Sequence, residues 1–284
     1  MAIPRIDAAL VERGLAGSLD EARLLVMEGK VYLGGGKAEK ASDKAKPGLV
    51  LTVRDNKLPY VSRGGYKLAR ALEAFGVDAR GRVCVDVGAS TGGFTDVLLQ
   101  AGAARVYAVD VGFGLLDWRL RSDARVTVME KTNARGLTGE LFDPRPSLGV
   151  TDVSFISLEA VLPPALCVLE GARRFVALVK PQFEARREDV GQGGVVRDRA
   201  VHEKVLGRIV RFVDTLGWQA RGLDISPITG AEGNIEFLLD IVPREADGAR
   251  DGLGRAPERL CEADIARVVA RAWARFHPDA EVER

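Results

Sequence analysis

The stretch VCVDVGASTGGFTDVLLQ, residues 83–100, constrains the fold more than any other part of the chain. Apolar residues alternate up to Val87 as in a short strand, a glycine-rich turn spans residues 88–93, and the apolar residues that follow have helical spacing. A strand, a turn and a helix in this order form the first unit of a doubly wound sheet. We therefore expect an α/β domain with a Rossmann-like, mostly parallel sheet.

The next predicted strand, ARVYAVD, ends in Asp110, where an acidic side chain can accept hydrogen bonds from two ribose hydroxyls. The turn GASTGG has Ser90 in place of the second glycine of a dinucleotide turn, and no P-loop lysine follows it. A turn without phosphate-binding features favours S-adenosylmethionine, with NAD as the alternative. Asp86 either accepts from the ammonium group of the cofactor or caps the turn. The expected cofactor-binding residues are Asp86, Gly88, Ser90, Gly92, Gly93, Asp110, Thr132, Asn133 and Asp152.

Composition limits the class of protein. The 284 residues, of which 46% are hydrophobic and 29% charged, suffice for one large domain and a small one. With a formal net charge of +1, any nucleic-acid surface must be a local patch. We find neither a signal sequence nor an apolar run of about 18 residues, and expect a cytoplasmic protein outside the membrane. The three cysteines and two histidines are scattered, which predicts buried thiols, surface histidines and no metal site.

The N-terminal region is a small basic unit. Two short helices are expected, over residues 4–15 and from the capping box at Ser18 to Glu21, followed by a hairpin from VYL to LVLTV. The order of these elements and the stretch SLDEARLLVMEGKVYLGGG resemble the S4 RNA-binding domain, which implies that the second helix and the following turn contact RNA. An ordinary solvated loop is the alternative for the lysines. The basic residues are Arg5, Arg23, Lys30, Lys37, Lys40, Lys44 and Lys46.

We expect three segments along the chain: an S4-like RNA-binding domain at 1–55, a polar linker at 56–62 and a methyltransferase domain at 63–284. In the last segment a helix from Leu158 should be interrupted at Pro163 and Pro164. Residues 242–258 are rich in Gly, Arg and Pro and predict a mobile loop. An amphipathic helix then ends the chain, and we expect it to pack on the body of the domain.

Four charged residues are candidates for chemistry. Asp152, Lys180 and Glu236 come at or beside predicted strand ends, where open α/β sheets bind their ligands. Lys67 lies in the first turn of a helix, against the helix dipole, as residues with a function often do. Lys180 closes the apolar run RFVALV, so we expect a carboxylate partner; a purely structural ion pair is the alternative.

The order Lys, Asp, Lys, Glu resembles the ribose 2'-O-methyltransferases of the FtsJ/RrmJ class. With the motifs SRGGYKL, DVGASTGGFTD, TDVSFIS, LVKPQFE and EGNIEFLL, the chain is similar over about residues 3–242 to the TlyA family of ribosomal RNA cytidine-2'-O-methyltransferases. This implies methyl transfer from S-adenosylmethionine to ribosomal RNA. On chemical grounds we assign Lys180 as the base, Lys67 as a second cation that positions the ribose, and the two carboxylates as groups that orient the lysines. The implied catalytic residues are Lys67, Asp152, Lys180 and Glu236.

Two further points concern the reaction and its alternatives. An ordinary lysine, with a pKa of about 10.4, is protonated at neutral pH; a second ammonium or a dry cleft favours the neutral amine, and carboxylates oppose it. Arg63 and Phe155 are expected to contact RNA, although Phe155 also suits a protein core. A ribosome assembly factor without catalysis and a membrane-active haemolysin remain alternative functions. The target nucleotide, the ribosomal subunit and the oligomeric state stay open.

Overall fold

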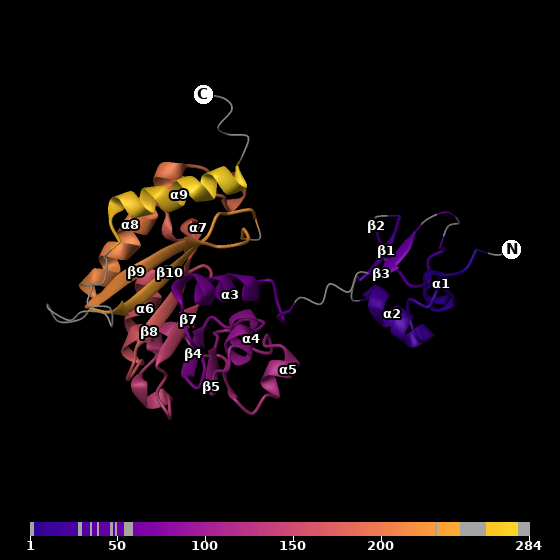
Figure 1. Cartoon of the computed structure of the whole chain (residues 1–284), viewed down its shortest axis with the longest axis horizontal. Helices are drawn as coiled ribbons and strands as arrows, with labels where there is room; N and C mark the ends of the chain where they lie inside the picture. Colours follow the sequence, from indigo (N-terminus) through magenta and orange to yellow (C-terminus); the bar gives the residue numbers. More distant parts are fainter. Residues whose placement is uncertain are drawn as a thin grey trace, which may run out of the picture. The chain divides into compact units, whose positions relative to one another are not determined.

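The computed structural model describes residues 3–27, 30–34, 36–38, 40–45, 48, 50–53, 59–230, 232–244 and 260–277. The side chain of Lys37, the residue Lys46 and most of the loop expected at 242–258 lie outside this description. The chain forms two compact units, residues 1–59 and residues 60–284 (Figure 1). Each unit has its own hydrophobic core and is described by itself.

The first unit packs two helices on a small antiparallel sheet. The helices are α1 (Ile6–Glu12) and α2 (Leu19–Met27), and the sheet has the order β2 (Gly36–Lys37), β1 (Val31–Leu33), β3 (Leu51–Val53). Ser18 caps α2 as predicted, because the Glu21 amide donates to Ser18 Oγ at 3.1 Å, whereas the Glu21 carboxylate accepts from the amide of Gly17 rather than from that of Ser18. Two helices followed by a small antiparallel sheet are the order of elements that the sequence predicts.

The second unit is built on a seven-stranded sheet of order β6-β5-β4-β7-β8-β10-β9. The strands from β4 to β8 run parallel, whereas β10 is antiparallel to both β8 and β9. The predicted mostly parallel α/β sheet is therefore confirmed. The strands are β4 (Val83–Val87), β5 (Arg105–Val109), β6 (Val126–Met129), β7 (Leu148–Thr151), β8 (Arg174–Val179), β9 (Trp218–Ile225) and β10 (Phe237–Pro243).

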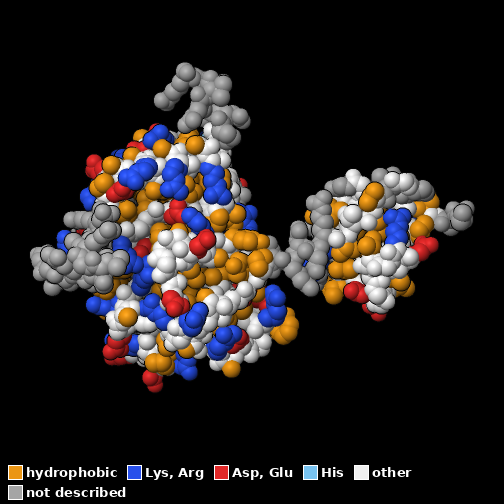
Figure 2. Space-filling view, in the orientation of Figure 1, with side chains coloured by type: hydrophobic (Ala, Val, Ile, Leu, Met, Phe, Trp, Pro, Cys, Tyr) orange, Lys and Arg blue, Asp and Glu red, His pale blue; other side chains and the backbone are white. Residues whose placement is uncertain are grey.

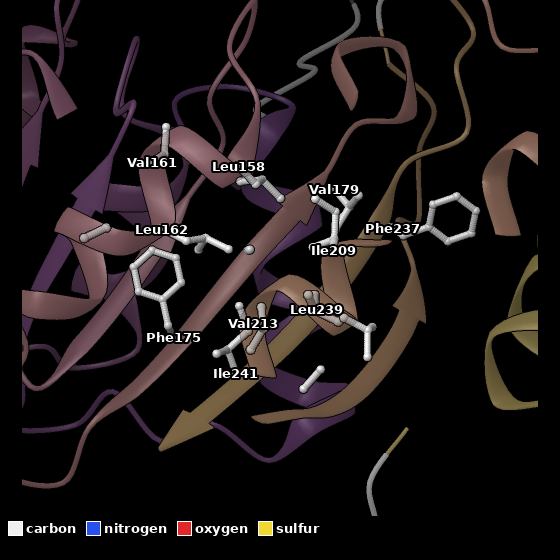
Figure 3. Packing of buried hydrophobic residues seen from close by; sticks show 14 of the residues in the cluster. Leu158, Val161, Leu162, Phe175, Val179, Ile209, Val213, Phe237, Leu239 and Ile241 are labelled. Atoms are coloured by element: carbon white, nitrogen blue, oxygen red, sulfur yellow. The ribbon is translucent and has the colours of Figure 1, made fainter. Parts of the chain in front are cut away.

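Side chains that alternate along the strands enter two cores, one on each face of the sheet. Cys84 contacts the core shared with α3, α4 and α5, while Val85 contacts the core shared with α6, α8 and α9. Figure 3 shows this second core, where Leu158 and Leu162 of α6 and Ile209 of α8 pack over the sheet. The helices are α3 (Gly64–Phe75), α4 (Gly93–Gln100), α5 (Trp118–Arg121), α6 (Leu158–Cys167), α7 (Pro181–Glu184), α8 (Arg199–Thr215) and α9 (Glu262–Phe276), with 3-10 turns at Ala134–Gly136, Gly139–Leu141, Arg187–Asp189 and Gln192–Gly194.

Three local predictions were wrong. Helix α6 continues through Pro163 and Pro164, because its flanking apolar residues are buried in the core and this packing outweighs the lost backbone hydrogen bonds. His202, expected at the surface, is fully buried on the inner face of α8, where its Nδ1 accepts from Trp273 Nε1 at 2.9 Å. Of the cysteines only Cys84 is buried, since Cys167 and Cys261 lie at helix ends that face solvent.

The terminal helix α9 packs on α8 and β9, as expected for an amphipathic helix at the edge of the domain. None of the helices in the described ranges combines the length and apolar character needed to cross a bilayer. Within the same ranges, no group of three or more His, Cys, Asp or Glu side chains is arranged to hold a metal ion.

Candidate active site

A crevice lies outside the carboxyl ends of β4 and β7, the position at which open α/β sheets bind ligands. It consists of two cavities of about 760 Å³ and about 540 Å³. The larger one contains Lys67 and Lys180 and is called the lysine lobe; the smaller one contains Asp110 and is called the nucleoside lobe. The lobes meet at the residues that line both of them: Gly88, Ser90, Asp152, Ser154 and Phe155.

The lysine lobe brings together all four predicted catalytic residues as two ion pairs. Lys67 Nζ of α3 lies 2.5 Å from Glu236 Oε2, and these two residues are 7% and 2% exposed. Lys180 Nζ, directly after β8, lies 2.6 Å from Asp152 Oδ1, directly after β7. Because buried charges are costly unless paired, each lysine is held in place by its carboxylate.

Glu236 lies before a strand, whereas Asp152 and Lys180 directly follow strands, yet all three lie at the same edge of the sheet. It precedes β10, whose first residue, Phe237, pairs with Val179 at the end of β8. Since β10 is antiparallel to β8, the start of β10 and the end of β8 lie at the same edge of the sheet. The sequence predicted a strand that bears Glu236, whereas the structure places this residue just before the strand.

The loop after β7 is held in a strained conformation. Phe155 has a φ of 62°, which is costly for a bulky residue, and its side chain is 90% exposed. Because the side chain is exposed, the alternative of a core phenylalanine is wrong, and its ring centroid lies 4.9 Å from that of Phe183. In the same loop Ser154 Oγ accepts a hydrogen bond of 2.8 Å from Lys180 Nζ.

Glu184 ties this loop to the segment after β8. Its carboxylate accepts from Ser157 Oγ and from the Leu158 amide, both at 2.7 Å, and it pairs with Arg208 at 3.2 Å. Burial raises the pKa of Glu184, and these hydrogen bonds and Arg208 oppose that shift. The two segments that carry Asp152 and Lys180 are thereby fixed relative to each other.

Glycines leave room at the turn between β4 and α4. Gly88 has a φ of 85°, and a Cβ atom there would lie 2.9 Å from Val153 Cγ1. A Cβ atom at Gly93 would lie 2.3 Å from Ser62 Oγ. The Ser90 amide in this turn donates to Asp110 Oδ2 at 2.8 Å. A larger side chain at 88 or 93 would therefore displace the walls of the crevice.

The nucleoside lobe combines an acidic group with apolar walls. Asp110 at the end of β5 accepts from the amides of Ser90 and Gly112, and each carboxylate oxygen retains a further lone pair. The predicted residues Thr132 and Asn133 also line this lobe, with Val111 and Leu115 as apolar neighbours. An acidic acceptor beside an apolar slot is suited to the ribose and base of a nucleoside.

Asp86 lies behind the crevice rather than in its wall. It is fully buried, and its Oδ2 accepts from Thr95 Oγ1 at 2.7 Å in the first turn of α4, whereas Oδ1 has no partner among the described residues. Burial raises the pKa of Asp86 to about 7. Its hydrogen bond to Thr95 matches the alternative in which Asp86 caps the turn. Neither Asp86 nor Gly92 is among the described residues that line the two lobes.

Two of the basic residues of the first unit, Arg5 and Arg23, share a carboxylate that the sequence analysis missed. Arg5 lies 2.8 Å and Arg23 3.3 Å from the Asp7 carboxylate, which is 2% exposed. A β-bridge joins Arg5 to Lys44, and Lys40 is exposed. Lys30 is half-buried. In the second unit Arg63 is exposed, lines the lysine lobe and donates to the carbonyl oxygen of Thr229.

Other contributors to the site were also missed. Ser154 and Glu184 both lie inside motifs that the sequence analysis quoted, two to four residues from predicted catalytic residues, so proximity in the chain could have indicated them. Gln182, Phe183 and Asn234 line the lysine lobe and carried no signal beyond their position.

Comparisons with known proteins agree with this geometry. Residues 60–241 match the family described as FtsJ-like methyltransferase, and residues 4–51 match the S4 domain. The chain is 46% identical over 258 residues to the Mycobacterium tuberculosis protein named 16S/23S rRNA (cytidine-2'-O)-methyltransferase TlyA, covering 89% of this chain and 96% of that protein. It is 41% identical over 239 residues to Hemolysin A of Brachyspira hyodysenteriae, covering 84% and 99% of the two chains. A solved structure from Streptococcus thermophilus, provisionally described as a hemolysin, has a TM-score of 0.74 at 42% identity, covering 99% of this chain and 100% of that one.

Proposed function

Because the chain belongs to the TlyA family, with an S4 domain and an FtsJ-like methyltransferase domain, we propose that it methylates the ribose 2'-hydroxyl of a cytidine in ribosomal RNA. The methyl donor would be S-adenosylmethionine, whose sulfonium supplies an electrophilic methyl group. The observation that carries the proposal is the lysine lobe, in which two lysine–carboxylate pairs share one cavity beside the glycine-rich turn.

The chain's own residues support this chemistry in distinct ways. In the proposed step the ribose oxygen forms a bond to the methyl carbon as the bond from that carbon to sulfur breaks, and the hydroxyl proton passes to the neutral amine of Lys180. The ion pair with the Asp152 carboxylate and the hydrogen bond that Lys180 Nζ donates to Ser154 Oγ would hold the Lys180 side chain in position. Lys67, held by Glu236, offers N–H groups to the ribose. In-line alignment by these residues would supply much of the acceleration.

The fit of the donor rests on the nucleoside lobe and the turn. Asp110 would accept from the ribose hydroxyls, and Thr132 and Asn133 would lie beside the adenine. Val153 and Ser62 approach the turn closely because Gly88 and Gly93 lack a Cβ atom, and this packing would keep the turn in the shape that leaves the lysine lobe open beside Asp152 for the methionine moiety, with Ser90 nearby. Asp86 and Gly92 would act from behind the wall by shaping the turn.

The RNA would be held by both units. We assign residues 1–55 to an S4-like RNA-binding domain, 56–62 to the linker and 63–284 to the methyltransferase domain. The cluster of Arg5, Arg23 and Lys40, with Lys30 and Lys37, would bind phosphates. Near the lysine lobe, Arg63 and the exposed ring of Phe155 would contact the target nucleotide, with Phe155 stacking on a flipped base. With ribosomal RNA as its substrate, the protein would act in the cytoplasm.

The test is a pair of substitutions at Lys180. Lys180→Ala should retain fold, cofactor binding and RNA binding but lose methyl transfer, because only the reaction uses the neutral amine. Lys180→Arg should also be inactive, since a guanidinium does not deprotonate near neutral pH. Lys204→Ala, on the exposed side of α8, is the matched control. Ribose methylation in ribosomal RNA is mapped by mass spectrometry, and near-normal turnover of Lys180→Arg would refute the role as base.

A further inference from the structure

The terminal helix α9 carries a row of arginines for which the methyltransferase match, ending at residue 241, gives no role. Arg267, Arg271 and Arg275 are four residues apart, so they lie on one face about 6 Å apart along the helix axis. All three are exposed. Figure 2 shows Lys and Arg side chains in a row over the position that α9 occupies in Figure 1. Among the described residues, these three side chains therefore form one solvent-exposed face of α9.

The row continues toward the active site through one short segment, residues 224–229. Arg271 Nη2 lies 3.3 Å from Asp224 Oδ1, and Arg70 Nη2 of α3 lies 2.7 Å from Asp224 Oδ2. Arg275 Nη2 donates to the carbonyl oxygen of Pro227 at 2.9 Å. Two residues further on, the carbonyl oxygen of Thr229 accepts from Arg63, which lines the lysine lobe. Together these arginines form what we call the arginine track: Arg63, Arg70, Arg267, Arg271 and Arg275.

The track carries more positive charge than its contacts neutralise. Asp224 is 6% exposed and is shared by two arginines, while the carbonyl oxygens at Pro227 and Thr229 carry no net charge. Among the described residues, the other carboxylates that pair with these arginines are Asp264, 2.6 Å from Arg267, and the exposed Glu73, 3.2 Å from Arg70. A guanidinium has five N–H donors, so the bonds described leave several of them facing solvent.

We propose that the arginine track binds backbone phosphates of the RNA strand that flanks the target nucleotide. Planar guanidinium groups bind phosphate oxygens in pairs, and a basic stripe along a helix is a typical footprint of nucleic-acid binding. The fixed side chains lose little freedom on binding. This inference rests on the proposed RNA substrate and assigns a role to α9.

The opposite face of α9 argues against a lipid surface as the ligand. A basic helix that binds membranes inserts an apolar face among the lipids. In α9 that face is already used, since Ile265, Val268, Val269 and Ala272 are buried against the body of the unit. Only the polar face with its arginines remains for a partner, which favours a ligand recognised by charge alone.

The test removes charge from the track without disturbing Asp224. The double variant Arg267→Gln/Arg275→Gln leaves Arg70 and Arg271 on that buried carboxylate. Binding of a fluorescently labelled ribosomal RNA hairpin with a single-stranded extension is measured by anisotropy over a series of KCl concentrations. We expect weaker binding and a slope of log Kd against log salt that is shallower by about 1 to 2, because each lost phosphate contact removes about 0.7 to 0.9.

Arg125→Gln is the matched control. Arg125 also combines a carboxylate, Asp123, with a carbonyl oxygen, that of Leu99, but it lies at the amino end of β6, at the far edge of the sheet from β9. For Arg125→Gln, the slope of log Kd against log salt should equal that of the wild type. All variants should keep the wild-type melting temperature and affinity for S-adenosylmethionine.

The outcomes separate this inference from the proposed function. A folded double variant with the wild-type affinity and slope would overturn the track as an RNA-binding surface. If the double variant binds RNA as the wild type does but no longer binds vesicles containing phosphatidylserine, the arginine track binds a lipid surface and the proposal is overturned. A shallower slope would support the track even if the wild type failed to methylate the hairpin, in which case the proposed function alone would fail.

Discussion

Replacing Glu236 by Gln should destabilise the second unit far more than its small change in shape suggests. The Lys67 ammonium would stay 7% exposed beside a neutral amide, with its only carboxylate partner among the described residues removed. Removing one partner of a buried ion pair costs about 3–5 kcal/mol, because the remaining charge is left uncompensated. For a unit of this size, residues 60–284, each kcal/mol lowers the melting temperature by about 2–4 °C. We therefore expect a decrease of roughly 6–20 °C.

The double variant Lys67→Met/Glu236→Gln should recover most of this loss, since no buried charge remains. Asp152→Asn should cost less than Glu236→Gln, because the Asp152 side chain is 20% exposed and Lys180 keeps Ser154 as an acceptor. All three tryptophans, Trp118, Trp218 and Trp273, lie in the second unit, so urea unfolding followed by tryptophan fluorescence reports this unit alone. All of these variants should lack methyl transfer.

Two results would refute the reasoning about the ion pair. One is a Glu236→Gln variant with wild-type stability, which would mean that water or another group neutralises Lys67. The other is a double variant no more stable than Glu236→Gln, which would mean that packing rather than charge decides the cost.

Three other perturbations test separate parts of the molecule. Gly88→Val should weaken S-adenosylmethionine binding at least tenfold, measured by calorimetry, because the new side chain crowds Val153. Asp110→Ala should weaken the same binding by removing the acceptor for the ribose hydroxyls. A wild-type protein that binds NAD but not S-adenosylmethionine would contradict the assignment of the cofactor. Arg5→Glu/Arg23→Glu/Lys40→Glu should weaken RNA binding and flatten its salt dependence while cofactor binding is unchanged, and an unaltered slope would rule out this cluster. Burial lowers the pKa of His202 to about 4, below its ordinary 6.5, so the folded state favours the neutral imidazole. The contribution of His202 to the free energy of unfolding should therefore fall by about 3 kcal/mol as the pH drops from 6.5 to 4. The variant His202→Phe should lose this pH dependence in urea titrations across that range.

The sheet and the active-site edge were predictable because their signals are local. Alternating or continuous apolar runs define β4 to β8, and Asp152 and Lys180 follow directly where two of those runs end. The burial of His202 was also encoded, since it shares the spacing of Val205, Leu206 and Ile209 on the inner face of α8. A preference for polar side chains at the surface overrode that periodicity in the prediction, and the periodicity was the better guide.

The pairings that depend on distant segments were not predictable. Asp224 joins Arg70 to Arg271, and Asp7 joins Arg5 to Arg23, only because the fold brings separate elements together. Nothing in the local sequence distinguishes these aspartates from solvated ones. The positive φ of Phe155 and the exposure of its side chain are likewise specified by no residue pattern around it.

The ion pair between Lys67 and Glu236 has a consequence for the folding of the protein during its synthesis on the ribosome. The two residues are 169 positions apart, and Glu236 arrives with the last strand of the sheet. Until β10 has emerged and docked beside β8, the growing chain holds a lysine without its counter-charge and a reaction centre with one member missing. Domains fold largely as units during synthesis, from the N-terminus onward. The first unit can thus mature early, whereas the second gains both full stability and its complete catalytic set in a single late step, so prematurely terminated chains lack both.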